Sequence, residues 1–475
     1  MTMPRFFFSL PYRSVFCALA VVALSALPHA SLAHDIEEEH VHTAGAAQTS
    51  EKKEADKKED AQAIYDHLQD FGKALDIIRD GYVEEVETKD LIAAAINGML
   101  SSLDPHSGYL SDQGYKDMEI RTKGRFGGLG IHVTMEEGLV KVVSPIDETP
   151  AARAGIQPND LIVEIDGEPV FGMTLQEAVN LMRGEPGTPI DLKIIRDKDN
   201  PPIDVSIVRD HIKIISVRGR IEDSNVGYLR ITDFNRSTHE SLLKAVNKLK
   251  EESKKESPET PLVGYVLDLR NNPGGLLDQA IFVSDAFLTG GEIVSTRGRN
   301  QRKFGRWDAS KDDIIQGLPM VVLINGGSAS ASEIVAGALQ DHKRAILLGT
   351  RSFGKGSVQT IRNLTEKTAI RMTTARYYTP SGRSIQSTGI EPDIFVEQAT
   401  IQPLQPRQGA RENDLPKALD KQKEDGEKTN TQVEAKNNER QDYQLQRAID
   451  LLQGLNLLQK AENHAPVISQ RAKSP

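Results

Sequence analysis

The chain has 475 residues, more than one typical domain, and this length predicts two or three domains with buried cores. It carries 58 Lys and Arg against 68 Asp and Glu, a formal net charge of −10, which argues against nucleic acid as the main partner. The single cysteine, Cys17, lies in the first segment, so the rest of the chain has neither a disulfide nor a thiol nucleophile. Covalent catalysis would have to use Ser, Thr, Lys or a carboxylate.

Residues 1–33 have the pattern of an export signal. Arg5 and Arg13 supply positive charge, residues 15–27 are apolar, and Ser31-Leu32-Ala33 is a small-x-small cleavage site. The apolar run is shorter than the roughly 20 residues that span a membrane, which favours a cleaved signal peptide over an uncleaved anchor. We therefore expect a periplasmic protein, with secretion or membrane association as the alternatives.

Residues 34–61 are rich in Glu, Lys, Ala and Asp, a composition typical of a charged, disordered linker. Its histidines lie in an acidic segment without fixed geometry, so no metal site is predicted there (His34, His40, His42). Between Ile64 and Leu103 apolar residues recur every three or four positions, which predicts an N-terminal helical region over residues 62–121. Asp104-Pro105-His106-Ser107 ends the helical pattern, and His106 in this turn is more typical of a local hydrogen-bonding group than of a catalytic base.

A separate unit is expected over residues 122–210. It opens with Gly128-Leu129-Gly130-Ile131, continues with predicted strands at 140–143 and 161–165 and a predicted helix at 174–182, and closes with a strand at 192–196. This order resembles a PDZ domain, in which a Gly-rich loop receives a terminal carboxylate and a peptide adds to a sheet edge. The glycines alone could simply make a tight bend.

Residues 211–400 alternate predicted strands and helices, which indicates an α/β domain with a largely parallel sheet. Loops at the strand ends are the expected place for a site. Residues 401–440 lose the apolar periodicity and are expected to be a disordered linker. An amphipathic helix is predicted at 441–460, followed by a tail at 461–475.

Ser330 lies where a predicted strand at 321–324 turns into a predicted helix. Ser330-Ala331-Ser332-Glu333 fits the Ser-x-x-Glu capping box, in which the serine caps the helix and the glutamate bonds back to its amide. The same hydroxyl could instead be a nucleophile, and Ser328 and Ser332 compete for that role. The local pattern does not decide whether Ser330 is a helix cap or a nucleophile.

The base for such a serine has two candidates in the same stretch. His342, next to Asp341, lies about three helical turns from Ser330, roughly 18 Å away, and could not reach it. Lys355 stands between Gly354 and Gly356, and burial could keep its amine neutral for part of the time. Gly-Lys-Gly by itself is most often a surface turn.

An ordered set of motifs resembles the carboxyl-terminal processing proteases, the tail-specific Ser–Lys peptidases. The similarity covers roughly residues 63–396 and the last helix. The motifs are the runs at 98–107, 268–275, 328–333, 353–359, 377–383 and 389–393, together with the inserted PDZ-like unit. The resemblance implies an α/β multidomain fold, with a protease core of mixed sheet and helices, an inserted PDZ domain, an N-terminal helical region and a C-terminal helix.

The resemblance also implies residue roles. Ser330 would be the nucleophile, Lys355 the general base and Gln359 the residue that orients the lysine. Four positions separate Lys355 from Gln359, which brings them together only if the backbone turns helically, because a straight strand holds them about 13 Å apart. The oxyanion would be held by the N–H groups of Ala331 and of Gly274 or Gly275. No metal and no organic cofactor is implied.

In the PDZ domain the resemblance assigns peptide binding to Gly128, Leu129, Gly130 and Ile131. Arg183, at the end of the PDZ helix, would link peptide binding to the catalytic domain, or would simply be an exposed charge stabilised by the helix dipole.

These features together predict an exported serine endopeptidase that binds protein C-termini through its PDZ domain. A non-catalytic PDZ adaptor or chaperone on the same scaffold is the alternative. A third hypothesis is a latent enzyme that becomes active when a partner binds to the last helix. Protein substrates are the expected partners. The sequence does not decide whether the protein also has an activating or adaptor partner, or whether it forms a homo-oligomer.

Overall fold

The computed structural model describes residues 44–464 except 198–199, 224, 257–260, 300–302, 311 and 400–441. The predicted signal peptide, the predicted linker at 401–440 and most of the predicted tail lie outside these residues. The chain divides after Thr88 into two compact units, which are described separately.

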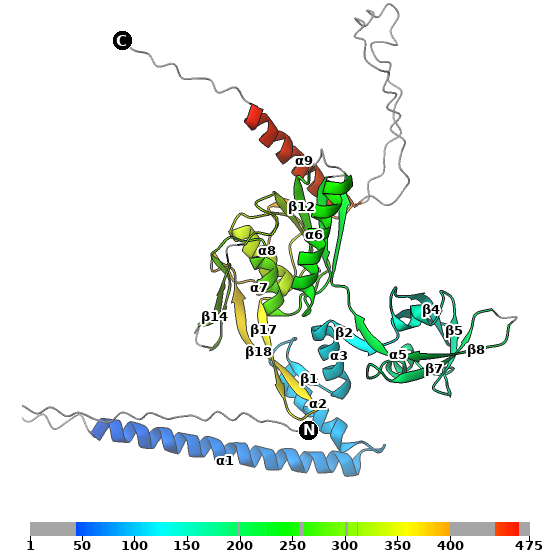
Figure 1. Ribbon diagram of the computed structural model, residues 1–475. Coiled ribbons are helices and arrows are strands. Elements are labelled where there is room, and N and C mark those ends of the chain that lie inside the picture. The colour runs from blue at the N-terminus through cyan, green and yellow to red at the C-terminus, as the bar shows by residue number, and fades with distance from the viewer. Residues whose placement is uncertain are drawn as a thin grey trace, which may run out of the picture. The chain divides into compact units, whose positions relative to one another are not determined.

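The first unit consists of helix α1 (Ala44–Gly81), drawn in blue in Figure 1. This helix begins inside the range 34–61, where a disordered linker was predicted, and the prediction was wrong for residues 44–61. The reason is that Ala, Glu and Lys have high intrinsic helix propensity, although they offer little apolar surface for a core. Several apolar side chains of α1 are exposed, namely Ile64, Tyr65, Leu68 and Phe71.

The second unit starts with α2 (Thr88–Ser101), β1 (Gly108–Leu110) and α3 (Asp112–Lys123). Between α2 and β1, Asp104 Oδ1 accepts hydrogen bonds from the amides of His106 and Ser107 at 2.8 and 2.9 Å. This side-chain turn ends the helical segment where the sequence predicted a break.

The PDZ-like unit is a sheet in the order β3-β4-β5-β7-β8, with β6 paired to β5. Its predicted helix is confirmed as α5, which Thr174 and Glu177 cap as a capping box. A buried apolar core fills the space between the sheet and its helices. The elements are β2 (Arg125–Gly128), β3 (Ile131–Glu136), β4 (Leu139–Pro145), α4 (Pro150–Arg153), β5 (Leu161–Ile165), β6 (Glu168–Pro169), α5 (Leu175–Met182), β7 (Pro189–Ile195), β8 (Ile203–Val208) and β9 (Asp210–Lys213), and β9 pairs with β2.

The predicted parallel sheet is confirmed in the order β10-β11-β12-β15-β16-β19, all parallel except the edge pair β10 and β11. Strands β12 and β15 are buried on both faces, as parallel strands between helices usually are. The strands are β10 (Val217–Glu222), β11 (Val226–Ile231), β12 (Gly264–Asp268), β15 (Met320–Ile324), β16 (Ile346–Gly349) and β19 (Ile394–Phe395).

Helices cover both faces of this sheet (Figure 1). Helices α6 (Thr238–Glu256), α7 (Leu277–Asp285) and α8 (Ala331–Asp341) share one apolar core with it. Helix α9 (Tyr443–His464) packs on the other face through Leu445, Ala448, Ile449 and Leu452. A second, antiparallel sheet contains β1, β13 (Glu292–Arg297), β14 (Lys303–Asp308), β17 (Ser357–Asn363) and β18 (Ala369–Tyr378).

An ion-pair network around the buried Arg270 joins Asp442, the residue before α9, to the end of β12. Arg270, 5% exposed, donates to Asp442 Oδ1 at 2.8 Å and to Oδ2 at 2.6 Å. It also donates to Asp268, which is fully buried. Because residues 271–275 follow directly, the start of α9 is tied to the base of the loop that contains Gly274 and Gly275.

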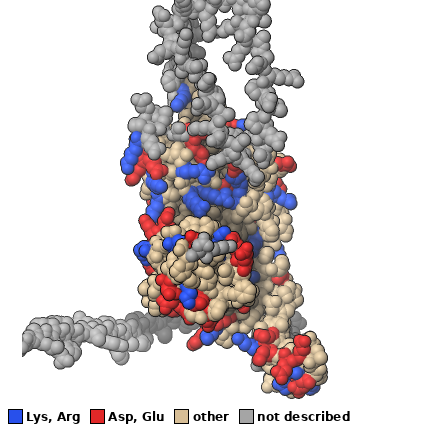
Figure 2. Space-filling model, turned by 90° about the vertical axis from the view of Figure 1, so that its right-hand side faces the viewer, with Lys and Arg blue, Asp and Glu red and all other residues tan. Residues whose placement is uncertain are grey.

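The surface carries charges of both signs. Figure 2 shows Lys and Arg side chains among Asp and Glu side chains on the face that it displays. Among the helices of the described part of the chain, none has the length and hydropathy needed to cross a membrane.

Candidate active site

The carboxylate of Glu333 joins the two halves of the predicted site. Its side chain is fully buried, and four donors surround it. Oε1 accepts from Ser352 Oγ at 2.6 Å and from the Gly354 amide at 2.7 Å. Oε2 accepts from the Ser330 amide at 2.7 Å and from the Lys355 amide at 2.9 Å. The amide nitrogens of Ser330 and Lys355 both bond to Oε2. These two nitrogens therefore lie within 5.6 Å of each other.

Burial raises the pKa of Glu333, and its hydrogen bonds from Ser352, Gly354, Ser330 and Lys355 oppose that effect. Sequence reasoning found only one of these bonds, the capping-box contact to the Ser330 amide. The bonds to Ser352, Gly354 and Lys355 depend on a loop that is about 20 residues away in the chain, and no local pattern shows them.

Ser330 occupies a strained turn between β15 and α8. Its φ of 55° and ψ of −112° lie outside the regions that non-glycine residues favour. The hydroxyl is placed as in a capping box but forms no cap hydrogen bond of acceptable geometry. The side chain is 8% exposed. A hydroxyl that is not committed to the helix end can serve chemistry.

The two competing serines have structural partners. Ser328 Oγ donates to the Leu269 carbonyl at 2.8 Å and accepts from the Asn325 amide at 3.0 Å. Ser332 Oγ donates to the Asn272 carbonyl at 2.9 Å. Both side chains are fully buried. These bonds fasten the turn to the loop after β12 and leave Ser330 as the available serine.

The loop with Gly274 and Gly275 lies against this turn. Gly274 has a φ of 99°, and a Cβ on it would lie 2.8 Å from Ser330 Cβ and 2.9 Å from the Ala331 nitrogen. A side chain there would therefore collide with the turn. The Gly274 amide donates to Asn272 Oδ1 at 2.9 Å. Ala331 is the first residue of α8, so its N–H has no partner within the helix.

Lys355 lies half-buried in the loop between β16 and β17, and its ammonium forms no hydrogen bond or ion pair with any residue in the described part of the chain. Its pKa is lowered, first by burial and then by the positive charges of Arg371 and Arg121. Glu333 and Asp104 act in the opposite direction. A lysine with a lowered pKa is neutral more often at neutral pH and can accept a proton.

The structure shows no hydrogen bond between the side chains of Gln359 and Lys355, both of which lie in its described part. Gln359 lies in β17, and its Nε2 donates to Ser357 Oγ at 2.9 Å and to Thr373 Oγ1 at 3.4 Å. The chain between the two residues is loop followed by extended strand, not a helical turn. The sequence left open whether the backbone between Lys355 and Gln359 is helical or extended, and in the structure it is not helical.

The structure shows local hydrogen bonds for both histidine candidates. His342 Nε2 bonds with the Glu292 carbonyl at 2.7 Å at the far end of α8, and Asp341 accepts from Arg383. The His106 carbonyl accepts from Arg371 Nε at 2.9 Å. Burial lowers the pKa of His106, and the charge of Lys355 adds to this effect. His106 therefore lies in a hydrogen-bonded turn.

The predicted carboxylate loop connects β2 to β3. Gly130 has a φ of 79°, and a Cβ on it would lie 2.3 Å from Thr149 Cβ. Strand β3 pairs only with β4 and so forms an edge of its sheet. Ile131 of β3 and Val179 of α5 pack against the same core. An open strand edge that follows a Gly-rich loop is suited to peptide addition.

Arg183 follows α5 and is not a free surface charge. Its guanidinium donates to Asp117 of α3 at 3.0 Å and lies 5.3 Å from the centre of the Phe126 ring. Helix α3 also carries Arg121, whose charge lowers the pKa of Lys355. One helix thus contacts the end of the PDZ helix and acts electrostatically on the candidate base.

Comparisons with protein families find three matches. Residues 225–396 match the model of peptidase family S41, residues 141–196 a PDZ domain, and residues 31–114 the activating protease CtpB N-terminal domain.

Similar curated proteins carry related descriptions. A carboxy-terminal-processing protease of Bartonella bacilliformis is 55% identical over 337 residues, which are 71% of this chain and 76% of that protein. The carboxy-terminal processing protease CtpA of Bacillus subtilis is 37% identical over 329 residues, 69% of this chain and 68% of that protein. Among solved structures, a photosystem II D1 C-terminal processing protease is 28% identical, with a TM-score of 0.40, and the match covers 69% of this chain and 92% of that one.

Replacing Glu333 tests its role as the link between the two loops. Glu333→Gln keeps the shape but turns an NH2 group toward amide and hydroxyl donors, so we expect a loss of about 3 kcal/mol or more in the free energy of unfolding. Chemical denaturation followed by circular dichroism measures this. The exposed Glu366→Gln in the β17–β18 turn is the control. Equal stability of both variants would show that the four hydrogen bonds do not hold the loops.

Proposed function

Because this chain belongs to peptidase family S41, as a carboxy-terminal processing serine protease with a PDZ domain, we propose that Ser330 is its nucleophile and Lys355 its general base. The observation that carries this proposal is the Glu333 carboxylate, which binds the backbone amides of both residues through one oxygen. The strain at Ser330 and the lowered pKa of Lys355 support the same roles.

The chemistry follows from these positions. Neutral Lys355 takes the proton from Ser330 Oγ as that oxygen attacks the scissile carbonyl carbon. The peptide C–N bond then breaks, Lys355 gives its proton to the leaving amine, and an ester links the substrate to Ser330. Water hydrolyses this ester with Lys355 as base, which releases the new carboxylate and restores the serine.

The oxyanion of each tetrahedral intermediate needs donors that are free of other bonds. The Ala331 amide at the start of α8 is one. For the second we propose Gly275, because the Gly274 amide already donates to Asn272. Gly274 instead lets the loop approach Ser330 closely.

Gln359 has a role only in a second arrangement of the loop. It bonds to Ser357 and Thr373, so it could orient Lys355 only after residues 355–359 move. We therefore assign the described arrangement to a resting enzyme, which favours the latent-enzyme hypothesis and leaves a place for an activating partner.

Substrate selection is assigned to the PDZ domain, which indicates that substrates bind through C-terminal peptides. We propose that Gly128, Leu129, Gly130 and Ile131 receive the terminal carboxylate while the peptide extends along β3. Peptide binding would then affect the position of helix α3 through the hydrogen bond from Arg183 to Asp117.

The nucleophile and base are tested with an unstructured protein substrate. Ser330→Ala and Lys355→Ala should each lower kcat/KM at least about 10⁴-fold, as the loss of one member of a catalytic set does. Lys355→Arg should be as inactive, since it keeps the charge but cannot give up its proton. The exposed Lys367→Ala is the control. Cleavage by Lys355→Arg at the wild-type rate would remove the lysine from the role of base.

Tail recognition is tested with one substrate prepared with a free or an amidated C-terminus. The free form should be cleaved faster, and Arg183→Ala should reduce this ratio at least about fivefold, because allosteric coupling typically amounts to a factor of that order or more. Tail-peptide affinity, measured by fluorescence anisotropy, should stay unchanged. Lys116→Ala, at an exposed lysine of α3 that pairs with Asp112, is the control. An unchanged ratio in Arg183→Ala would make Arg183 a structural residue.

We propose that residues 1–33 are a signal peptide and that the enzyme works in the periplasm. The basic start, the apolar run and the Ser31-Leu32-Ala33 site support this. Expressed in a Gram-negative host, the full chain should yield a periplasmic protein whose N-terminal sequence begins at His34. Ala33→Phe should block this cleavage and Ala46→Phe should not. Recovery of the whole chain with an intact N-terminus from the cytoplasm would refute the assignment.

A further inference from the structure

A buried tyrosine hydroxyl far from the catalytic residues lacks a hydrogen-bond partner. Tyr265 lies near the start of β12 with its side chain fully buried, and its hydroxyl bonds to no residue in the described part of the chain. Buried hydroxyl groups are nearly always bonded, because leaving one unpaired costs free energy. The orphan donor therefore indicates a missing partner.

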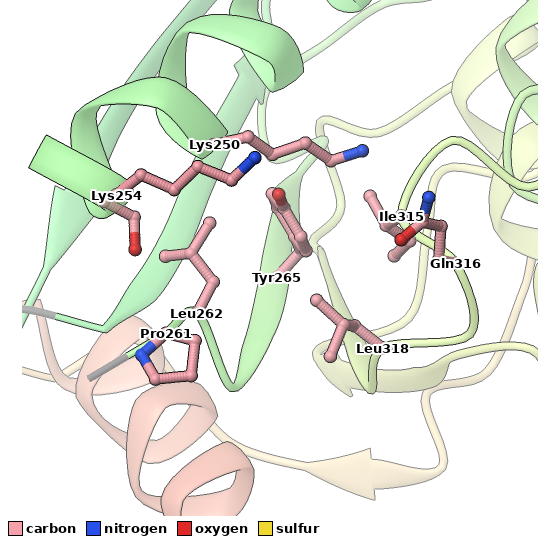
Figure 3. Close-up of a pocket in the computed structure, with 9 residues that line it drawn as sticks. Lys250, Lys254, Pro261, Leu262, Tyr265, Ile315, Gln316 and Leu318 are labelled. Atoms are coloured by element: carbon pink, nitrogen blue, oxygen red, sulfur yellow. The ribbon is translucent and has the colours of Figure 1, made fainter. Parts of the chain in front are cut away.

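The partner's place is a cavity of about 490 Å³ beside this side chain (Figure 3), which is within the usual size range of small-molecule sites. The lining residues come from α6, the start of β12 and the segment before β15: Lys250, Ser253, Lys254, Pro261, Leu262, Tyr265, Ile315, Gln316 and Leu318. These are the amino ends of β12 and β15, whereas Ser330 and Gly274 follow their carboxyl ends. The cavity is thus separate from the catalytic site.

The polar groups around the cavity are donors and positive charges. In Figure 3 the side chains of Lys250 and Lys254 extend from α6 over the hydroxyl end of Tyr265. Lys250 Nζ donates to the Ile314 carbonyl at 2.5 Å, which leaves two further N–H groups. Lys254 forms no ion pair with a residue that the structure describes. No acidic side chain is among the described residues that line the cavity, so it favours an anion.

The state of Tyr265 fits the same preference. Burial raises the pKa of its hydroxyl to about 12, so the group stays protonated at neutral pH and can donate. The remaining walls are apolar, with Pro261, Leu262, Ile315 and Leu318. Inorganic phosphate would leave these walls without a partner, and a neutral hydrocarbon would leave the two ammonium groups and the hydroxyl unbonded.

We propose that this cavity binds a small organic carboxylate with a compact apolar body. The carboxylate oxygens accept from the Tyr265 hydroxyl and from Lys254 or Lys250, and the apolar body packs on Leu262, Ile315 and Leu318. The site is a second ligand site of this protease, at the opposite ends of the strands that lead to the catalytic loops.

Isothermal titration of the whole protein with 3-phenylpropionate tests the proposal. We expect a submillimolar Kd, and binding at least about tenfold weaker for the neutral 3-phenylpropanol. Tyr265→Phe and Lys254→Met should each weaken the carboxylate about tenfold, as the loss of one charge-assisted hydrogen bond does. Lys244→Met, an exposed lysine on the same helix that pairs with Glu240, should bind like the wild type.

Three results would overturn the proposal. One is equal affinity for carboxylate and alcohol, and another is equal affinity of the wild type, Tyr265→Phe and Lys254→Met. The third is absence of 3-phenylpropionate binding at millimolar concentration, and a lower Tm for ligand-free Tyr265→Phe would then mean that an ordered water satisfies the hydroxyl. If the cavity is a ligand site, ligand-free Tyr265→Phe should have the same Tm as the wild type or a higher one, because the substitution removes the unpaired hydroxyl. Lys254→Met, at an exposed position, keeps the test valid if Tyr265→Phe does not fold.

Discussion

The catalytic assignment depends on one buried carboxylate. Glu333 accepts hydrogen bonds from the Ser330, Gly354 and Lys355 amides and from the Ser352 hydroxyl, and it therefore holds the turn after β15 against the loop before β17. A buried charge is tolerated only when donors replace its water, and here the donors are parts of the site. The same carboxylate that caps helix α8 thus fixes the backbone of Ser330, the proposed nucleophile, relative to that of Lys355, the proposed base.

The parallel sheet brings the loops after β12 and β15 to the same place, next to the Glu333 carboxylate. Strands β12 and β15 are neighbours in parallel register, so the loops that follow them meet at one edge of the sheet. Ser328 and Ser332 fasten these loops to each other through the Leu269 and Asn272 carbonyls. On the other face of the sheet, Arg270 connects the same loop to Asp442 at the start of α9. The C-terminal helix is therefore part of the support of the site.

The proposed regulation rests on two sets of contacts, those of Gln359 and those of helix α3. The side-chain amide of Gln359, the third predicted catalytic residue, donates to Ser357 and Thr373. Helix α3 contacts Arg183 at the end of the PDZ helix, and it carries Arg121, a charge that lowers the pKa of Lys355. Movement of α3 upon tail binding would therefore change the environment of the base as well as the position of the PDZ helix.

The sequence by itself determined the α/β alternation, the PDZ-like unit and the set of candidate residues, because apolar periodicity, capping residues and motif order are local properties of the chain. It excluded His342 by helix geometry alone. It could not choose between a capping and a catalytic Ser330, or show whether Gln359 reaches Lys355. It also predicted disorder for residues 44–61, which lie in helix α1, since low apolar content does not prevent a helix rich in Ala, Glu and Lys. Only the tertiary structure decided the shared role of Glu333 and the unpaired Tyr265 hydroxyl, because hydrogen bonds and burial between distant segments exist only once the sheet brings them together.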